Sequence, residues 1–336
     1  MKNRTYFYIS GILFLFLSCF SYASEEINYH NSPTDITTMI KNGKNQNALN
    51  SINKRVKTLK RDLLTVKKAN TPEYTTLYDD IAELSIVKYE LLMAIGKEDE
   101  INRDEICNFI LEYEEVEFIK TGFYKTPFHE SVARTVRNIA SLYKICHPPM
   151  AERYLNSLLK IKEHIYGKES AEVATVYDLL GDYYRLSMAE FSKAIAGYQK
   201  AKKIREKLYG VDDLRVTQNY NRLAISLFYH GEKSQSQKLI AKSLHIHKRD
   251  KNLSQLALAK VLIGSADFYV MTGEESRSLG YLKEAEKLLY QIPKEKSLEM
   301  MELYHRVSNL YLNLGDEKAS QEYAKKVSLL KEQNRR

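Results

Sequence analysis

Serines followed three positions later by a lysine are the residues that first suggest chemistry, because such a lysine can take the proton of an attacking serine. The triplet Lys120-Thr121-Gly122 would supply a further cation to such a site. The serine–lysine pattern begins at Ser51, Ser85, Ser141, Ser157 and Ser328. All five serines lie in stretches with ordinary amphipathic helical spacing, and a lysine-rich chain generates such pairs by chance. We therefore expect no serine nucleophile.

Two further clusters could bind a metal or a proton. His245 and His247 are two residues apart, so on a helix their rings would point about 200° apart, and no Cys, Asp or Glu nearby completes a ligand set. We expect both histidines to be solvated near a helix end. The acidic run from Glu112 to Glu117 is interpreted as an exposed helix face. Gly-rich phosphate loops and Gly-x-Ser-x-Gly or His-Glu-x-x-His motifs are absent. The sequence thus predicts no enzyme, no metal and no cofactor.

Composition points to helices that must position whatever the chain binds. The 336 residues include only 13 Gly and 6 Pro, and there is no Trp but 25 Tyr, so tyrosine should supply most of the large aromatic packing. The formal net charge is +8. We expect this surplus to be spread along the helices beside almost as many acids, with no compact basic cluster, which disfavours nucleic acid. Weak association with an anionic envelope surface is left as an alternative.

The N-terminus resembles a targeting signal. A basic stretch, MKNRTYFYIS, precedes the apolar run GILFLFLSCF, and Ser21-Tyr22-Ala23 offers small residues to a signal peptidase. We predict a signal peptide over residues 1–23, an exported chain that is periplasmic or secreted, and no membrane span after cleavage. An uncleaved anchor is the alternative; a lipidated Cys19 fits less well because Phe16 is not small. Residues 24–45 form a polar segment.

Cleavage would leave two cysteines, Cys107 and Cys146, in an oxidising compartment. Cys107 lies early in a helix expected to end near Gly122, and Cys146 closes the next helix. If the two helices run antiparallel about a turn near Lys125, the distances of the two cysteines from that turn differ by three residues, about 4.5 Å of helical rise. A disulfide is therefore within reach, with two buried thiols that never meet as the alternative.

A repeated sequence motif organises the rest of the chain. Residues 160–181 read KIKEHIYGKESAEVATVYDLLG, and 43 positions later residues 203–224 read KIREKLYGVDDLRVTQNYNRLA. Gly231, Gly273 and Gly315 follow at intervals of 42 residues. A fixed period of this size predicts stacked helix pairs, each of which buries its apolar face only against its neighbours. N-caps are expected at Thr71, Thr126, Ser170 and Asp212.

Small and large positions recur in a set order within these units, as in Gly181, Ala194 and Tyr198 or Ala224, Ser236 and Ile240. Together with the KIREKLYG ending, this order resembles the tetratricopeptide repeat, in the 42-residue form of kinesin light chains. The resemblance implies an all-α, right-handed α-solenoid. We assign residues 46–128 to a divergent helical cap and residues 129–336 to about five repeat pairs.

In proteins of that family the first helix of each pair lines a concave groove that holds a peptide or a partner's helix. Carried over by position, the resemblance assigns the peptide-binding residues as Arg134, Arg137, Asn138, Lys144, Asp178, Asp182, Arg185, Asn221 and Arg222. Taken with the leader, the lack of catalytic motifs and the mainly basic groove, this mode of binding predicts an exported, non-catalytic scaffold or adaptor for an acidic peptide or helix. The alternative function is a regulatory or sensor subunit that contacts a partner enzyme or receptor through its N-terminal helices.

Overall fold

The computed structural model describes residues 34–41, 45–66, 71–292 and 297–333. The predicted signal peptide over residues 1–23 lies outside these residues, as does most of the predicted polar segment 24–45. Within the described ranges every regular element is a helix and there is no strand, which confirms the all-α expectation. The chain divides into two compact units: residues 34–40 and 45–208 belong to the first, and residues 209–333 to the second. This division lies 80 residues beyond the predicted end of the cap at residue 128.

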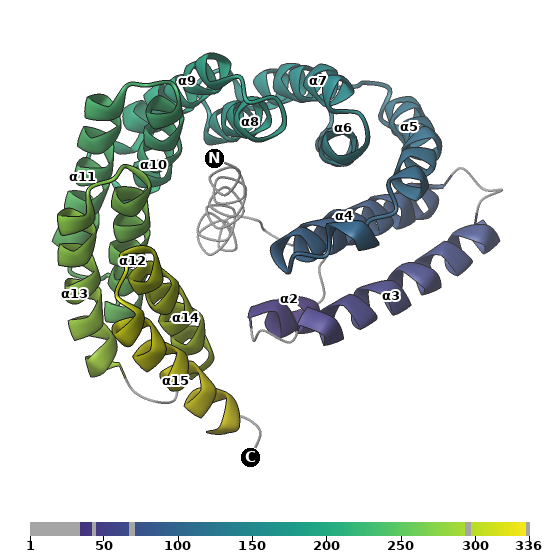
Figure 1. Ribbon diagram of the computed structural model, residues 1–336. Helices are drawn as coiled ribbons and strands as arrows, with labels where there is room; N and C mark the ends of the chain where they lie inside the picture. The colour runs from purple at the N-terminus through teal and green to yellow at the C-terminus, as the bar shows by residue number, and fades with distance from the viewer. Residues whose placement is uncertain (1–33, 42–44, 67–70, 293–296, 334–336) are drawn as a thin grey trace, which may run out of the picture. The chain divides into compact units, whose positions relative to one another are not determined.

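The first unit is a succession of packed helices (Figure 1). They are α2 (Thr34–Lys41), α3 (Asn45–Val66), α4 (Pro72–Ala94), the 3₁₀ turn η1 (Glu98–Glu100), α5 (Arg103–Tyr124), α6 (Glu130–Cys146), α7 (Pro148–Tyr166), α8 (Ala171–Asp182), the π-helical turn η2 (Tyr183–Ser187) and α9 (Phe191–Tyr209), which ends at the boundary. Helix α3 packs on α4, α5 on α6, and α6 on α7.

The second unit consists of three helix pairs (Figure 1). They are α10 (Leu214–Tyr229) with α11 (Lys233–Arg249), α12 (Gln255–Met271) with α13 (Glu275–Gln291), and α14 (Ser297–Asn313) with α15 (Glu317–Gln333). The two units thus consist of stacked helical hairpins, the architecture of an α-solenoid of tetratricopeptide type.

Side-chain caps begin several helices where the sequence indicates. Thr71 accepts a hydrogen bond from the backbone N–H of Tyr74 at the start of α4, and Ser170 does the same for Val173 in α8. The expected cap at Asp212 is one residue off, because Asp213 is the residue that accepts from the backbone of α10. Helix α6 starts at Glu130, three residues after the Thr126-Pro127 signal, with His129 as its cap.

Glycine closes the first helix of each pair in the second unit. Gly231, Gly273 and Gly315 have φ angles of 96°, 75° and 80°, in the left-handed region that favours glycine, so the predicted helix ends are confirmed. At the equivalent place between α8 and α9 the left-handed residue is Ala189, with a φ of 53°. A side chain there carries a steric cost that the glycines avoid.

One inserted residue explains why the first interval is 43 rather than 42 residues. The paired small residues Ala224 and Ser236 are 12 positions apart, whereas Gly181 and Ala194 are 13 apart. The extra residue is absorbed where α8 widens into the π-helical turn η2.

Small residues let the helices of a pair approach closely. A Cβ added to Gly181 would lie 2.5 Å from the Tyr198 ring, so only glycine fits beneath that tyrosine. In the second unit a serine hydroxyl donates to a carbonyl oxygen 12 residues away in each pair: Ser236 to Ala224 at 2.6 Å, Ser278 to Ala266 at 2.9 Å and Ser308 to Ser320 at 2.8 Å. The recurring small positions of the sequence are therefore contact points between paired helices.

Tyrosine supplies the large buried aromatic surface, as the composition predicts. Side chains that are less than 2% exposed include Tyr78, Tyr113, Tyr183, Tyr198, Tyr220 and Tyr269.

A disulfide joins Cys107 of α5 to Cys146 of α6, with their Cα atoms 5.7 Å apart. The pairing expected from helix counting is present, although α5 extends to Tyr124 and turns on Lys125 rather than ending at Gly122. The bond fastens the N-terminal part of α5 to the last residue of α6.

Candidate functional site

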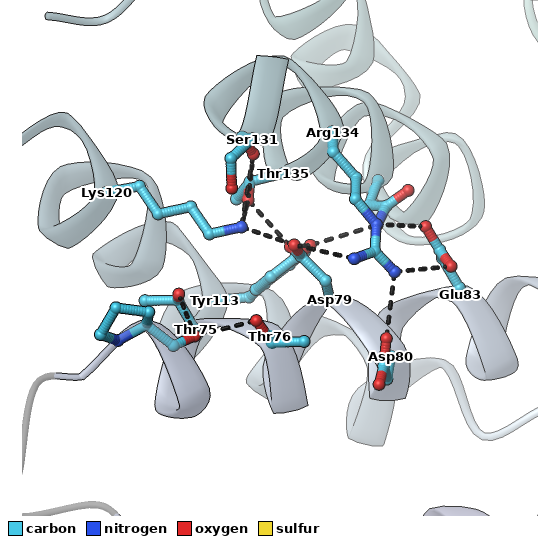
Figure 2. Close-up of polar contacts among 12 residues, drawn as sticks. Thr75, Thr76, Asp79, Asp80, Glu83, Tyr113, Lys120, Ser131, Arg134 and Thr135 are labelled. Carbon is cyan, nitrogen blue, oxygen red and sulfur yellow. Dashed lines mark hydrogen bonds and ion pairs between the residues drawn. The ribbon is translucent and has the colours of Figure 1, made fainter. Parts of the chain in front are cut away.

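A buried ionic cluster ties α4, α5 and α6 together in the first unit (Figure 2). At its centre, Lys120 Nζ of α5 lies 2.5 Å from Asp79 Oδ2 of α4, and both side chains are 2% exposed. The second carboxylate oxygen of Asp79 accepts hydrogen bonds from Tyr113 Oη at 2.5 Å and from Thr135 Oγ1 of α6 at 2.8 Å. Four side chains from three helices thus share one buried negative charge.

Lys120 uses all its hydrogen-bonding capacity inside this cluster. Besides Asp79, its Nζ donates to Thr135 Oγ1 at 3.0 Å and to the carbonyl oxygen of Ser131 at 3.3 Å, so all three N–H groups are engaged. Burial lowers the pKa of the Lys120 ammonium from its ordinary value, and the charge of Asp79 offsets only part of that effect. Lys120 is therefore a structural cation, and its Lys-Thr-Gly triplet forms no catalytic site.

Arg134 occupies the rim of the cluster, where the predicted peptide-binding residues begin. Its Nε and Nη2 bind the two oxygens of Glu83 at 2.8 and 2.9 Å, and Nη2 also reaches Asp80 Oδ1 at 3.0 Å (Figure 2). Burial alone would raise the pKa of Glu83, but its contacts with Arg134 lower it overall. This fork holds Arg134, 24% exposed, within the protein and neutralises its charge.

Two predicted groove residues are buried, which corrects their assignment. Asn138 is 2% exposed and donates to Tyr113 Oη at 3.2 Å. Asp178 is also 2% exposed and is paired with Arg205, which reaches it from α9. Buried polar groups need internal partners, and these two side chains help pack helices rather than face a ligand.

Asp182 and Arg185 lie at the junction of α8 and η2, with side chains 21% and 9% exposed. Both bind the same hydroxyl: Tyr198 Oη donates to Asp182 Oδ1 at 2.6 Å, and Arg185 Nε donates to Tyr198 Oη at 3.2 Å. Arg185 Nη2 also lies 3.4 Å from Asp182. Their charges largely offset each other, and the pair fixes the widened turn against α9.

One line of polar side chains on α6 is accessible to solvent. We call it the α6 polar stripe; its members are Ser131, Arg134, Arg137, Ser141 and Lys144. They are spaced three or four residues apart, so they share one helix face, and every residue between them from 132 to 143 is buried. Between residues 131 and 144, the stripe is the part of α6 that a partner can touch.

Within the stripe, Arg137 is the most exposed cation. Arg137 is 48% exposed and touches Glu83 through a single contact of 3.4 Å, compared with the bidentate contact of Arg134. Lys144 is half-buried. A carboxylate on a ligand can replace the long Arg137–Glu83 contact without breaking the buried cluster beneath.

The second unit carries the remaining two predicted residues. Asn221 and Arg222 are half-buried on α10. Each compact unit thus has its own predicted positions, and those of the first unit lie on α6, α8 and η2.

The other motifs with possible chemistry are used for packing. His247 is 2% exposed, with Nδ1 2.7 Å from the carbonyl oxygen of Ser243, so the expectation of a solvated residue is wrong. In the acidic run, Glu114 accepts hydrogen bonds from the hydroxyls of Tyr143 at 2.7 Å and Tyr154 at 2.6 Å. The expected free acidic face is therefore partly an acceptor for neighbouring tyrosines.

The described ranges contain neither a cluster suited to a metal ion nor a helix suited to cross a membrane. There, no three His, Cys, Asp or Glu side chains gather as a metal site would need. Nor does any helix in those ranges have both the length and the apolar character required to cross a membrane.

Sequence reasoning missed the ionic cluster itself. Asp79 and Lys120 are 41 positions apart, and no local pattern pairs them. The available signals were a pair of acids, Asp79-Asp80, between the apolar residues Tyr78 and Ile81, and a lysine at position 120 next to Ile119. Each breaks an apolar helix face, which is a mark of a buried charge that requires a partner.

Comparison with known proteins supports the repeat architecture. The chain is similar to BtubC (BKLC) from P. vanneervenii, with a TM-score of 0.51 and 18% identity over 70% of this chain and 90% of that one. It is equally similar, at 0.51, to a putative kinesin light chain of Podosopora anserina with nearly identical TPR-like repeats, at 14% identity over 62% of this chain and 99% of the other. These likenesses concern the fold.

Sequence comparison finds similarity over a smaller part of the chain. A stretch of 173 residues is 25% identical to the clustered mitochondria protein homolog of Xenopus tropicalis, which covers 51% of this chain but only 13% of that protein. No family model matches the chain. Together these findings define a helical-repeat fold of TPR-like type. Within that class, the structural neighbours are kinesin-light-chain-like repeat proteins.

Proposed function

We propose that the chain is a non-catalytic scaffold that binds a segment of another protein along the α6 polar stripe. The observation that carries this proposal is the exposure pattern of α6, a helix otherwise buried over residues 132–143 that leaves open only polar positions. Polar side chains that lie in a row on the accessible face of a helix fit an extended or helical ligand.

Charge favours a ligand segment that carries carboxylates. Arg134 is already neutralised by Glu83 and Asp80, whereas Arg137 keeps capacity for a further anion. An acidic side chain of the partner approaching Arg137 would form a stronger contact than the 3.4 Å one with Glu83.

A photo-crosslinking experiment in the host cell tests the location. A photoreactive residue, p-benzoylphenylalanine, is placed at Ser141 in the stripe and, as a control, at Lys160, which is exposed on α7. We expect Ser141 to crosslink to a discrete protein and Lys160 to give none. Crosslinks that form from Lys160 while Ser141 stays silent would refute the binding surface.

A second candidate function is a subunit that docks on a partner through its N-terminal helices. It is favoured by α5, where Leu111 and Phe118, seven positions apart on one helix face, are 64% and 82% exposed. The same photoreactive residue at Phe118 separates the two functions: a crosslink from Phe118 without one from Ser141 selects docking through α5.

We also propose that the chain acts outside the cytoplasm, on the strength of the leader-like residues 1–23. N-terminal sequencing of the protein from its native host should begin at Ser24. An intact Met1 would exclude cleavage.

A further inference from the structure

The positive charge of the chain is concentrated in one segment, which corrects the expectation that it is spread along the helices. Residues 36–72 contain nine Lys or Arg and a single carboxylate, Asp62. This surplus of eight equals the formal net charge of the whole chain, +8, so the remaining residues balance one another. Five of the nine cations lie on α3.

Helix α3 has one buried side and one basic side. Ala48, Leu49, Ile52 and Leu63 are buried within the first unit. Lys54, Lys57 and Arg61 are exposed and follow one another at intervals of three and four residues, so they form a row on one helix face. Arg55 is exposed beside them. The 22 residues of α3 give a straight surface roughly 33 Å long.

The cations of this row are largely unneutralised. Among the described residues, no carboxylate lies within 4.0 Å of Lys54, Arg55 or Lys57. Arg61 only reaches its neighbour Asp62, at 4.0 Å. By contrast Lys60, on the edge of the helix nearer α5, is paired with Glu105 at 2.8 Å. The outward side of α3 therefore presents uncompensated positive charge.

An apolar side chain completes this surface. Leu64 is 76% exposed and lies three residues after Arg61 and seven after Lys57, in line with the row. A large exposed leucine next to a row of cations is typical of helices that rest in a headgroup layer, where the cations bind phosphates and the leucine reaches the acyl boundary.

We propose that the α3 basic face, defined as Lys54, Arg55, Lys57, Arg61 and Leu64, binds the surface of an anionic phospholipid bilayer. Each cation close to such a surface adds to the attraction, which fades within a Debye length of about 8–10 Å. The apolar run at residues 11–20 is a separate feature that brings this end of the chain to a membrane, as a leader or as an anchor. Single-stranded nucleic acid is less favoured, because α3 has no aromatic side chain on which a base could stack.

Vesicle sedimentation of the intact protein tests the proposal. Vesicles of pure phosphatidylcholine are compared with vesicles containing about 30% phosphatidylglycerol, where the anionic lipid should raise the partition coefficient at least about tenfold at low salt. The triple variant Lys54→Gln, Lys57→Gln, Arg61→Gln should lose most of that gain. Salt at about 0.5 M should remove most of the gain in partition coefficient as well.

A matched variant removes the same charge elsewhere. Lys238, Lys283 and Lys287 are exposed on α11 and α13, and their change to Gln should leave vesicle binding as in the wild type. Equal loss in the two triple variants would overturn the proposal, since it would reflect net charge alone. Equal binding of wild type to both kinds of vesicle would also overturn it and would assign binding to the apolar run.

A third arm separates phospholipid from nucleic acid. Binding to a 20-base-pair duplex that depends on the α3 cations, with no binding to phosphatidylglycerol vesicles, would replace the membrane by nucleic acid and overturn the proposal. The variant Leu64→Ser should weaken vesicle binding without affecting any binding to duplex, because only a bilayer offers an apolar layer to that side chain.

Discussion

Lys120 of α5 and Asp79 of α4 form an ion pair of 2.5 Å that is 2% exposed on both sides. Removal of one partner leaves the other charge buried, so Lys120→Met should lower the free energy of unfolding by about 3–5 kcal/mol. The double variant Asp79→Asn, Lys120→Met should recover part of this loss because no net charge remains buried. Urea unfolding followed by circular dichroism measures all three proteins. A loss below about 1 kcal/mol in Lys120→Met would contradict the cluster.

Substitutions of Asp178 and Arg137 should differ in their effect on stability, although both residues were predicted to bind peptide. Asp178→Asn breaks the buried pair with Arg205 and should destabilise the first unit by about 2–4 kcal/mol. Arg137→Gln removes a half-exposed charge and should change stability by less than about 0.5 kcal/mol. Thermal unfolding of the two variants compares them directly. A stable Asp178→Asn protein would return that residue to the list of ligand contacts.

The backbone at Ala189 offers a stabilising change. With a φ of 53°, Ala189 bears the cost of a Cβ in the left-handed region, so Ala189→Gly should raise the free energy of unfolding by about 1 kcal/mol. Gly231→Ala is the matched control: it has no atom within 4 Å of the new Cβ, so its expected loss of about 1 kcal/mol is a backbone effect alone. Chemical denaturation checks both. An Ala189→Gly variant that is no more stable than wild type would show that the turn costs nothing.

His247 should make the stability of the second unit sensitive to mild acid. Burial lowers its pKa below the ordinary value of 6.5, so between neutral pH and the lowered pKa the unfolded chain binds a proton that the folded chain does not. Stability from this group is complete above pH 6.5 and falls as the pH drops. We expect His247→Gln to flatten the decline between pH 7.5 and 5.5, and His245→Gln, at an exposed position, to preserve it. An unchanged slope in His247→Gln would refute the assignment.

The sequence contained enough to derive the repeats but not the internal partners of the groove. Gly231, Gly273 and Gly315 marked the helix ends because their backbone angle is a local property. Cys107 and Cys146 could be paired by counting along two antiparallel helices. Whether Asp178 faces a ligand or a neighbouring helix depends on Arg205 of α9. The repeat register does not predict that Arg205 contacts Asp178.

The same limit applies to the ionic cluster and to the charge of α3. Asp79 and Lys120 come from different helices, and their contact is a product of tertiary packing. The basic segment, by contrast, was readable in the sequence as a stretch with one acid between residues 36 and 72. Its share of the net charge becomes visible only when the charge is counted by segment rather than over the whole chain.

The central claim, that the α6 polar stripe binds a partner protein, is tested most directly by affinity capture from envelope extract with wild type and with Arg137→Glu, Lys144→Glu. A control variant, Lys160→Glu, Lys203→Glu, carries the same change of charge at exposed positions outside the stripe. We expect the stripe variant to capture at least about tenfold less of the protein that crosslinks to Ser141, with unchanged thermal stability, while the control captures as much as wild type. Undiminished capture by the stripe variant at low salt would show that the partner binds elsewhere.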